Sequence, residues 1–230
     1  MALPIVNSSK YELKLPSGKT VKYRPFLVKE EKILLVANET GKQSDMVRAT
    51  KEVLTACTFN EVNPSKLSLS DFEYLFLNIR GKSVGEVLKL KVMCPDDMKT
   101  YVNVDININD IKMPEQMKVD NVVEITDKIK VELRQPSIDD LSDVSETPTT
   151  TEMIDIVGKC ISRVYDGETV YEDISKSDRE TFLNSLTTSQ FQKLSLYYET
   201  MPKVSHKVKV TNPKTSVESE VVLEGLNNFF

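Results

Sequence analysis

Apolar and polar residues alternate in several short runs of this chain, as they do in strands with one buried face. The first run, over 11–15, is followed by the turn residues Pro16-Ser17-Gly18-Lys19 and by a second run through Val21 and Tyr23. This order predicts a β-hairpin, which Pro25 ends because proline cannot donate to a strand ladder. Further strands are predicted at 88–92 and 102–108, over 120–134, and at 208–210 and 221–223.

Between these runs, the apolar residues recur at helical spacing. Helices are predicted at 28–39 and 45–57, after the capping box Ser70-Asp71-Phe72-Glu73, and briefly at 137–144. Another helix is predicted to carry Met153, Val157, Cys160, Ile161 and Val164 on one face, and two more to open at the capping boxes Ser177-x-x-Glu180 and Ser189-x-x-Gln192. Hairpins and amphipathic helices together predict an α+β fold.

The order of these elements occurs twice. An Arg-Pro corner at Arg24 recurs at Arg134, and Ser70-x-Phe72-x-x-Leu75-x-Leu77 recurs as Ser189-x-Phe191-x-x-Leu194-x-Leu196. We therefore predict two similar halves, 1–118 and 119–230, each with antiparallel hairpins packed against amphipathic helices. The alternative is that capped helices and hairpins look alike by chance.

Composition narrows the function classes. The chain has 230 residues with 30 basic and 35 acidic side chains, a net charge of −5, so it lacks the basic footprint of a nucleic-acid-binding protein. No apolar stretch is long enough to span a membrane. We expect no signal peptide, because the N-terminal residues lack a basic region and a long apolar region. Three cysteines, an odd number, favour buried thiols in a reducing cytoplasm over a disulfide framework.

The motifs that could carry chemistry are incomplete, so we expect no cofactor and no metal. Gly18-Lys19-Thr20 has Leu13 where a phosphate-binding loop needs glycine. Asp105-x-Asn107-x-Asn109 lacks the glycine and the final glutamate of a calcium loop. A zinc ribbon needs paired cysteines at both hairpin tips, but only Cys94 is present. An enzyme using Cys94 and His206 stays open as a minor alternative.

The chain ends on Leu226-Asn227-Asn228-Phe229-Phe230, whereas a free tail is usually polar. Two aromatic residues at the end predict that the tail docks, either in the core of the second half or on a partner protein.

Several segments together resemble a known family. These are 21–32 with its Arg24-Pro25-Phe26 core, 72–86, Met201-Pro202-x-x-x-His206, and the terminal Leu-x-Gly-Leu-x-x-Phe-Phe. In this order they resemble the baseplate hub assembly proteins of T4-like bacteriophages. Some relatives carry a Cys-Pro-x-Cys knuckle at the last hairpin tip, where this chain has Asn212 and Thr215, so the resemblance does not carry a metal role over to this chain.

The resemblance implies a hub component or an assembly chaperone that binds hub or tail proteins in the host cytoplasm, without enzymatic activity. An alternative is a structural virion protein that is retained in the mature baseplate. The predicted contact residues for partner proteins are Arg24, Pro25, Phe26, Leu226, Phe229 and Phe230. The competing interpretation is structural, with Arg24 paired to an acidic side chain and the phenylalanines in the core.

Overall fold

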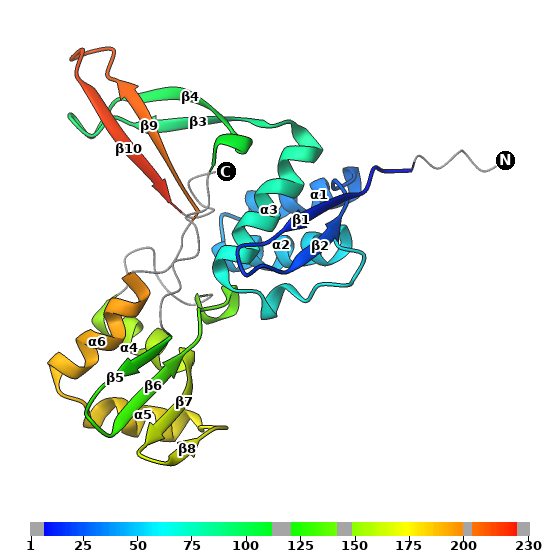
Figure 1. The fold of residues 1–230 in the computed structure, drawn as a ribbon. Helices are drawn as coiled ribbons and strands as arrows, with labels where there is room; N and C mark the ends of the chain where they lie inside the picture. Colours follow the sequence, from blue (N-terminus) through cyan, green and yellow to red (C-terminus); the bar gives the residue numbers. More distant parts are fainter. Residues whose placement is uncertain (1–6, 112–120, 142–148, 200–203, 225–230) are drawn as a thin grey trace. The chain divides into compact units, whose positions relative to one another are not determined.

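The computed structural model describes residues 7–111, 121–141, 149–199 and 204–224. They form helices and small antiparallel sheets, which confirms the α+β class (Figure 1). The chain divides into two compact units. Unit 1 comprises Met1–Pro64, Ser70–Glu115 and Pro202–Phe230, and unit 2 comprises Ser65–Leu69 and Gln116–Met201.

The described residues of unit 1 form three hairpins and three helices. Its elements are β1 (Tyr11–Lys14), β2 (Thr20–Tyr23), α1 (Val28–Glu39), α2 (Gln43–Cys57), α3 (Leu69–Val84), β3 (Val87–Met93), β4 (Tyr101–Asn107), the 3₁₀ turn η2 (Ile108–Asp110), β9 (Ser205–Thr211) and β10 (Glu218–Glu224). A further 3₁₀ turn, η1 (Pro64–Lys66), lies where the first segment of unit 1 ends. The predicted helix at 28–39 is α1 with the same bounds, and the one at 45–57 is α2, which begins two residues earlier.

Hairpins β3–β4 and β9–β10 share one hydrophobic core. Strand β3 alternates exposed and buried side chains along its length, and the buried ones pack with residues of β4, β9, β10 and α3. The buried members of this cluster are Leu77, Leu88, Leu90, Val92, Ile106, Ile108, Ile111, Val204, Val208, Val210 and Leu223. The last predicted hairpin therefore completes the core of unit 1.

Hydrogen bonds also join the tips of these two hairpins. Asn212 Nδ2 donates to both carboxylate oxygens of Asp96, each at 3.0 Å, and Thr215 Oγ1 donates to Asp96 Oδ2 at 2.5 Å. These hydrogen bonds lower the pKa of Asp96, because they favour its ionised form. The two tips are thus joined by a carboxylate and two neutral donors.

Unit 2 is a four-stranded antiparallel sheet with helices. Its elements are β5 (Val122–Glu124), β6 (Ile129–Leu133), the 3₁₀ turn η3 (Ile138–Leu141), α4 (Thr150–Cys160), β7 (Ile161–Asp166), β8 (Thr169–Tyr171), α5 (Lys176–Ser185) and α6 (Thr188–Glu199). The strand order is β5-β6-β7-β8. Buried residues of β6, β7, α4, α5 and α6 form its core, among them Val131, Val157 and Leu194.

The predicted helix through Cys160, Ile161 and Val164 is wrong at its end. Helix α4 stops at Cys160, and Ile161–Asp166 forms β7, which pairs with β6 on one side and β8 on the other. Apolar residues at 161 and 164 suit a helical face as well as a strand. The structure of this segment is therefore decided by its non-local pairing with β6. The spacing of its apolar residues does not decide between helix and strand.

Three predicted capping boxes differ from the structure, two of them by two residues. Helix α5 is capped by Ser175, whose hydroxyl accepts from the N–H of Asp178, so the box at Ser177 is wrong. At α6, the N–H of Thr187 donates to Gln190, so the box at Ser189 is two residues late. Helix α3 begins at Leu69, which places Ser70 inside its first turn.

The predicted halves and the compact units differ. The halves 1–118 and 119–230 follow the order of elements, whereas β9–β10 packs in unit 1 because its apolar face covers that of β3–β4. The duplication itself stays a prediction.

Replacing Leu88 by alanine should lower the free energy of unfolding by about 2–5 kcal/mol, because it leaves a cavity at a side chain with 0% exposure. The adjacent Val87→Ala, at a side chain 52% exposed, should cost less than about 1 kcal/mol. Urea denaturation followed by circular dichroism measures both. Equal losses for the two variants would contradict the burial of Leu88 in this core.

Candidate interaction site

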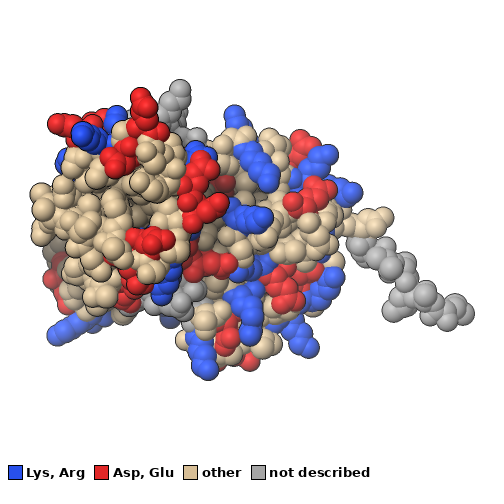
Figure 2. All heavy atoms as spheres, turned by 90° about the horizontal axis from the view of Figure 1, so that it is seen from below, with Lys and Arg blue, Asp and Glu red and all other residues tan. Residues whose placement is uncertain are grey.

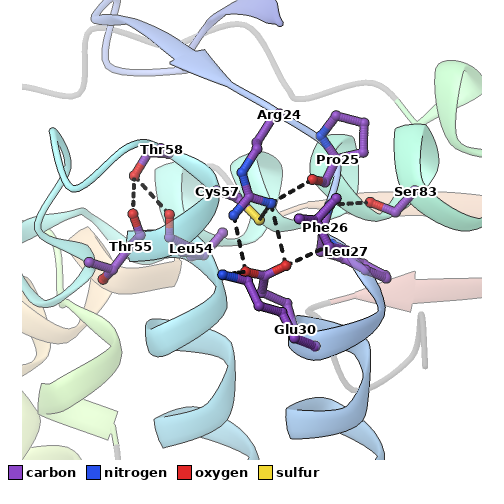
Figure 3. A network of polar contacts seen from close by, with 11 residues as sticks. Arg24, Pro25, Phe26, Leu27, Glu30, Leu54, Thr55, Cys57, Thr58 and Ser83 are labelled. Atoms are coloured by element: carbon purple, nitrogen blue, oxygen red, sulfur yellow. Dashed lines mark hydrogen bonds and ion pairs between the residues drawn. The ribbon is translucent and has the colours of Figure 1, made fainter. Parts of the chain in front are cut away.

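Arg24 links the end of β2 to the C-terminal end of α2 (Figure 3). Its backbone N–H donates to the carbonyl oxygen of Cys57 at 3.0 Å, and its Nη1 donates to the carbonyl oxygen of Pro25 at 2.9 Å. The guanidinium Nη2 lies 3.0 Å from Oε1 of Glu30, and only 12% of the Arg24 side chain and 3% of the Glu30 side chain are exposed. Charges this far from water need a partner, so each holds the other in place.

Glu30 connects this ion pair to the first turn of α1. Its Oε2 accepts from the backbone N–H of Leu27 at 2.7 Å, one of the donors that a helix start leaves without an internal partner. Burial alone would raise the pKa of Glu30, but the hydrogen bonds from Arg24 and Leu27 outweigh burial and lower it. The hydrogen bond with Glu30 raises the pKa of Arg24.

Phe26 connects the corner, the segment from Arg24 to Glu30, to a third element, α3. Its backbone N–H donates to Ser83 Oγ on α3 at 2.8 Å (Figure 3). That hydroxyl donates to the carbonyl of Ile79 at 2.6 Å. The segment from Arg24 to Glu30 is therefore bonded to the ends of α2 and α3 as well as to α1.

This anchored corner opens a helix with an exposed apolar surface. We define the α1 apolar face as Leu27, Val28, Leu35 and Val36, whose exposed fractions are 41%, 81%, 57% and 54%. Val28 and Leu35 are seven residues apart and so lie on the same side of the helix. Exposed large apolar side chains along one helix are a feature of protein interaction sites.

A second corner in unit 2 repeats these contacts. The backbone N–H of Arg134 donates to the carbonyl of Cys160 at 2.9 Å, and its guanidinium contacts the carboxylate of Asp140 at 2.7 and 3.0 Å. Asp140 in turn accepts from the N–H of Ser137, three residues earlier, as Glu30 does from Leu27. In both corners the arginine precedes its carboxylate by six residues.

The cysteines are poorly suited to nucleophilic chemistry. All three are free and buried, and burial raises the pKa of Cys57 and of Cys160 to about 11. Burial and two nearby aspartates raise the pKa of Cys94 as well. A protonated thiol is a weak nucleophile. His206 lies on β9 opposite Leu223.

Other chemistry has no visible site in the described residues. Among them, no three His, Cys, Asp or Glu side chains gather as metal ligands would. None of the described helices is long and apolar enough to cross a membrane. Basic and acidic side chains are interspersed on the face drawn in Figure 2, without a continuous basic field.

The predicted contact residues fall into two groups. Arg24 pairs with Glu30, as the structural interpretation expected, while Pro25 and Phe26 are half-buried beside it. Leu226, Phe229 and Phe230 lie outside the described residues. Whether any of the six contacts a partner stays a prediction.

Sequence reasoning missed the α1 apolar face. The available signal was the run Ile33-Leu34-Leu35-Val36, because four consecutive apolar residues exceed what one face of a helix can bury.

Comparison with known proteins places the chain in a family. The family model described as T4 bacteriophage base plate protein matches residues 8–230, nearly the whole chain. The chain belongs to this family. No curated protein and no solved structure matches it significantly.

The family match confirms the resemblance to a baseplate family of T4-like phages. It also makes other phage baseplate proteins the expected partners of this baseplate protein, and the tail of the virion its expected location. The anchored corner and the α1 apolar face are therefore features of a protein from a multi-protein assembly.

Replacing Arg24 by alanine should destabilise unit 1 by about 3 kcal/mol, because it removes the buried cation of the Glu30 carboxylate and leaves that carboxylate with the largely exposed Lys29, whose Nζ lies 3.4 Å from Oε1. Lys22→Ala is the matched control. Lys22 forms an exposed ion pair with Glu12 at 3.8 Å, and its loss should cost less than about 1 kcal/mol. Thermal unfolding of both variants measures the difference, and similar losses would contradict an anchoring role for Arg24.

Glu30 should also make stability depend on pH. Because its pKa is lowered in the folded chain, its contribution is fully present above the ordinary value of 4.5 and is lost as the pH falls through the folded pKa. The Glu30→Gln variant should therefore lose less stability than the unmodified protein on acidification from about pH 6 to about pH 3. Glu12→Gln, at an exposed side chain, serves as the control, and parallel pH profiles for all three proteins would show that Glu30 does not contribute.

Proposed function

We propose that this baseplate protein acts in assembly of the baseplate hub by recognising hub or tail subunits, as an assembly chaperone or a hub component. The α1 apolar face carries the proposal. It leaves more than half of the side chains of Val28, Leu35 and Val36 in water, in a member of a family whose proteins belong to a large assembly.

The contacts of the corner explain how the α1 apolar face can be held in a fixed conformation before a partner binds. Apolar side chains on a loose segment would lose conformational freedom on binding, and that loss weakens affinity. Here Arg24, Glu30 and Ser83 hold the start of α1 before any partner arrives. Recognition would then bury Leu27, Val28, Leu35 and Val36 against an apolar surface of the partner.

No catalytic step is part of the proposal. The raised pKa values of the three thiols support this, because an enzyme using Cys94 with His206 would need a thiolate. Normal tail assembly by Cys94→Ala and His206→Ala variants would remove the enzymatic alternative.

Mass spectrometry can separate the two structural roles. A hub component, like a virion protein retained in the mature baseplate, would be found at constant stoichiometry in purified particles. An assembly chaperone would be captured with hub proteins in infected cells but would be missing from the particles. Failure to find hub or tail proteins in either sample would overturn the proposed function.

A substitution on α1 tests the proposed surface directly. Leu35→Lys should reduce the amount of captured baseplate protein by about tenfold, because the interface would have to bury a charge where an apolar side chain fitted. Leu196→Lys on α6 is the matched control, since Leu196 is also a helical leucine and is 58% exposed against 57% for Leu35. Both variants should keep the melting temperature. Equal capture by both variants would exclude the α1 apolar face as the binding surface.

A further inference from the structure

A second surface, independent of α1, lies at the margin of the sheet in unit 2. Strand β8 (Thr169–Tyr171) is the last in the order β5-β6-β7-β8 and pairs with β7 through Val164↔Tyr171, Tyr165↔Val170 and Asp166↔Thr169. In the parts of the chain that the structure describes, no strand pairs with its other edge. An open edge presents backbone N–H and C=O groups that can pair with an extended chain.

The side chains of β8 do little to protect this edge. Proteins usually discourage strand addition with lysine or proline on an edge strand, and β8 has neither. Instead it exposes 47% of Val170 and 51% of Tyr171, residue types that favour pairing across strands. By contrast, the exposed positions of β3 include Lys89 and Lys91, and those of β9 include Lys207 and Lys209.

Charge indicates which extended chain would suit this edge. Unit 2 has 10 basic and 17 acidic residues, a net charge of −7, whereas unit 1 has 20 basic and 18 acidic residues, a net charge of +2. Around β8, Asp166, Glu168, Glu172 and Asp173 flank the exposed apolar pair. Arg163 pairs with Glu172 at 2.9 Å and offsets one of these charges.

The same charges oppose pairing between two copies of this chain at β8. Such a contact would bring the acidic flanks of both copies together, and like charges on facing strands are destabilising. A segment with lysine or arginine next to its apolar residues would instead meet charges of opposite sign.

We propose that the open edge of β8 binds an extended segment of another protein, in which basic and apolar residues alternate, as an added strand of the sheet. This contact goes beyond the proposed function because it uses unit 2 and does not involve the α1 apolar face. Backbone hydrogen bonds would supply the pairing and the acidic flanks the preference for a basic partner. Val170 and Tyr171 lie on opposite faces of the strand, so the apolar residues of the partner would contact the one that shares their face.

An NMR titration of the full chain with a short peptide of alternating lysine and valine tests the proposal. We expect shifts concentrated at the amides of residues 168–172 and a dissociation constant of about 1 mM or tighter. The same peptide with alternate amides methylated should bind about tenfold more weakly, because it cannot donate to the edge. A peptide of alternating glutamate and valine should not bind.

The matched variants are Val170→Lys and Val222→Lys, since both valines lie on strands and both are 47% exposed. Val170→Lys should weaken binding of the lysine-valine peptide about tenfold, whereas Val222→Lys on β10 should leave it unchanged. Three results would overturn the proposal: shifts confined to other residues, equal binding of the methylated peptide, or equal binding by both variants. Since neither variant touches α1, these results are separate from the Leu35→Lys experiment.

Discussion

A buried arginine–carboxylate pair at the start of α1 holds the first unit in its arrangement. Arg24 and Glu30 can leave water only together, and in doing so they fix the direction in which the chain leaves β2 and enters the helix. The backbone of Arg24 is bonded to the end of α2, and that of Phe26 to α3. The segment around this one charge pair thereby connects three helices and a hairpin, and it fixes where α1 begins.

The corner in unit 2 shows that the same polar contacts can form where a different element follows them. Arg134 and Asp140 keep the same spacing and the same contacts with a cysteine carbonyl and with an N–H three residues before the carboxylate. The carboxylate is one methylene shorter, and a 3₁₀ turn, η3, replaces the helix that follows. The common part is therefore the polar contact, while the element it starts can vary. The duplication stays a prediction, and the two units do not coincide with the two predicted halves.

Much of the fold could be predicted from sequence, because a hairpin with one buried face must alternate its side chains. Leu88, Leu90 and Val92 do so, and their hairpin forms where expected. The sequence was insufficient to predict the element where a residue fits the period of a helix as well as that of a strand. Ile161 continues the buried face of α4 as well as it begins β7, and only pairing with β6 separates the two. The site was predicted in part. The Arg-Pro corner is visible as a motif, but which apolar residues of α1 face water depends on how α1 packs beside α2, and that packing is not local.

The placement of β9–β10 bears on how the protein is made. Unit 2 lies in sequence between the parts of unit 1, so the ribosome releases β3 and β4 well before the hairpin that covers them. At roughly 5–20 residues per second, the nascent chain carries the bare apolar side of β3–β4 for several seconds while unit 2 is synthesised. Unit 2 can complete its own core in that interval. Synthesis of unit 1 thus begins before that of unit 2, but the core of unit 1 is completed after it. A chain that ends before Leu223 would keep an open hydrophobic surface prone to aggregation.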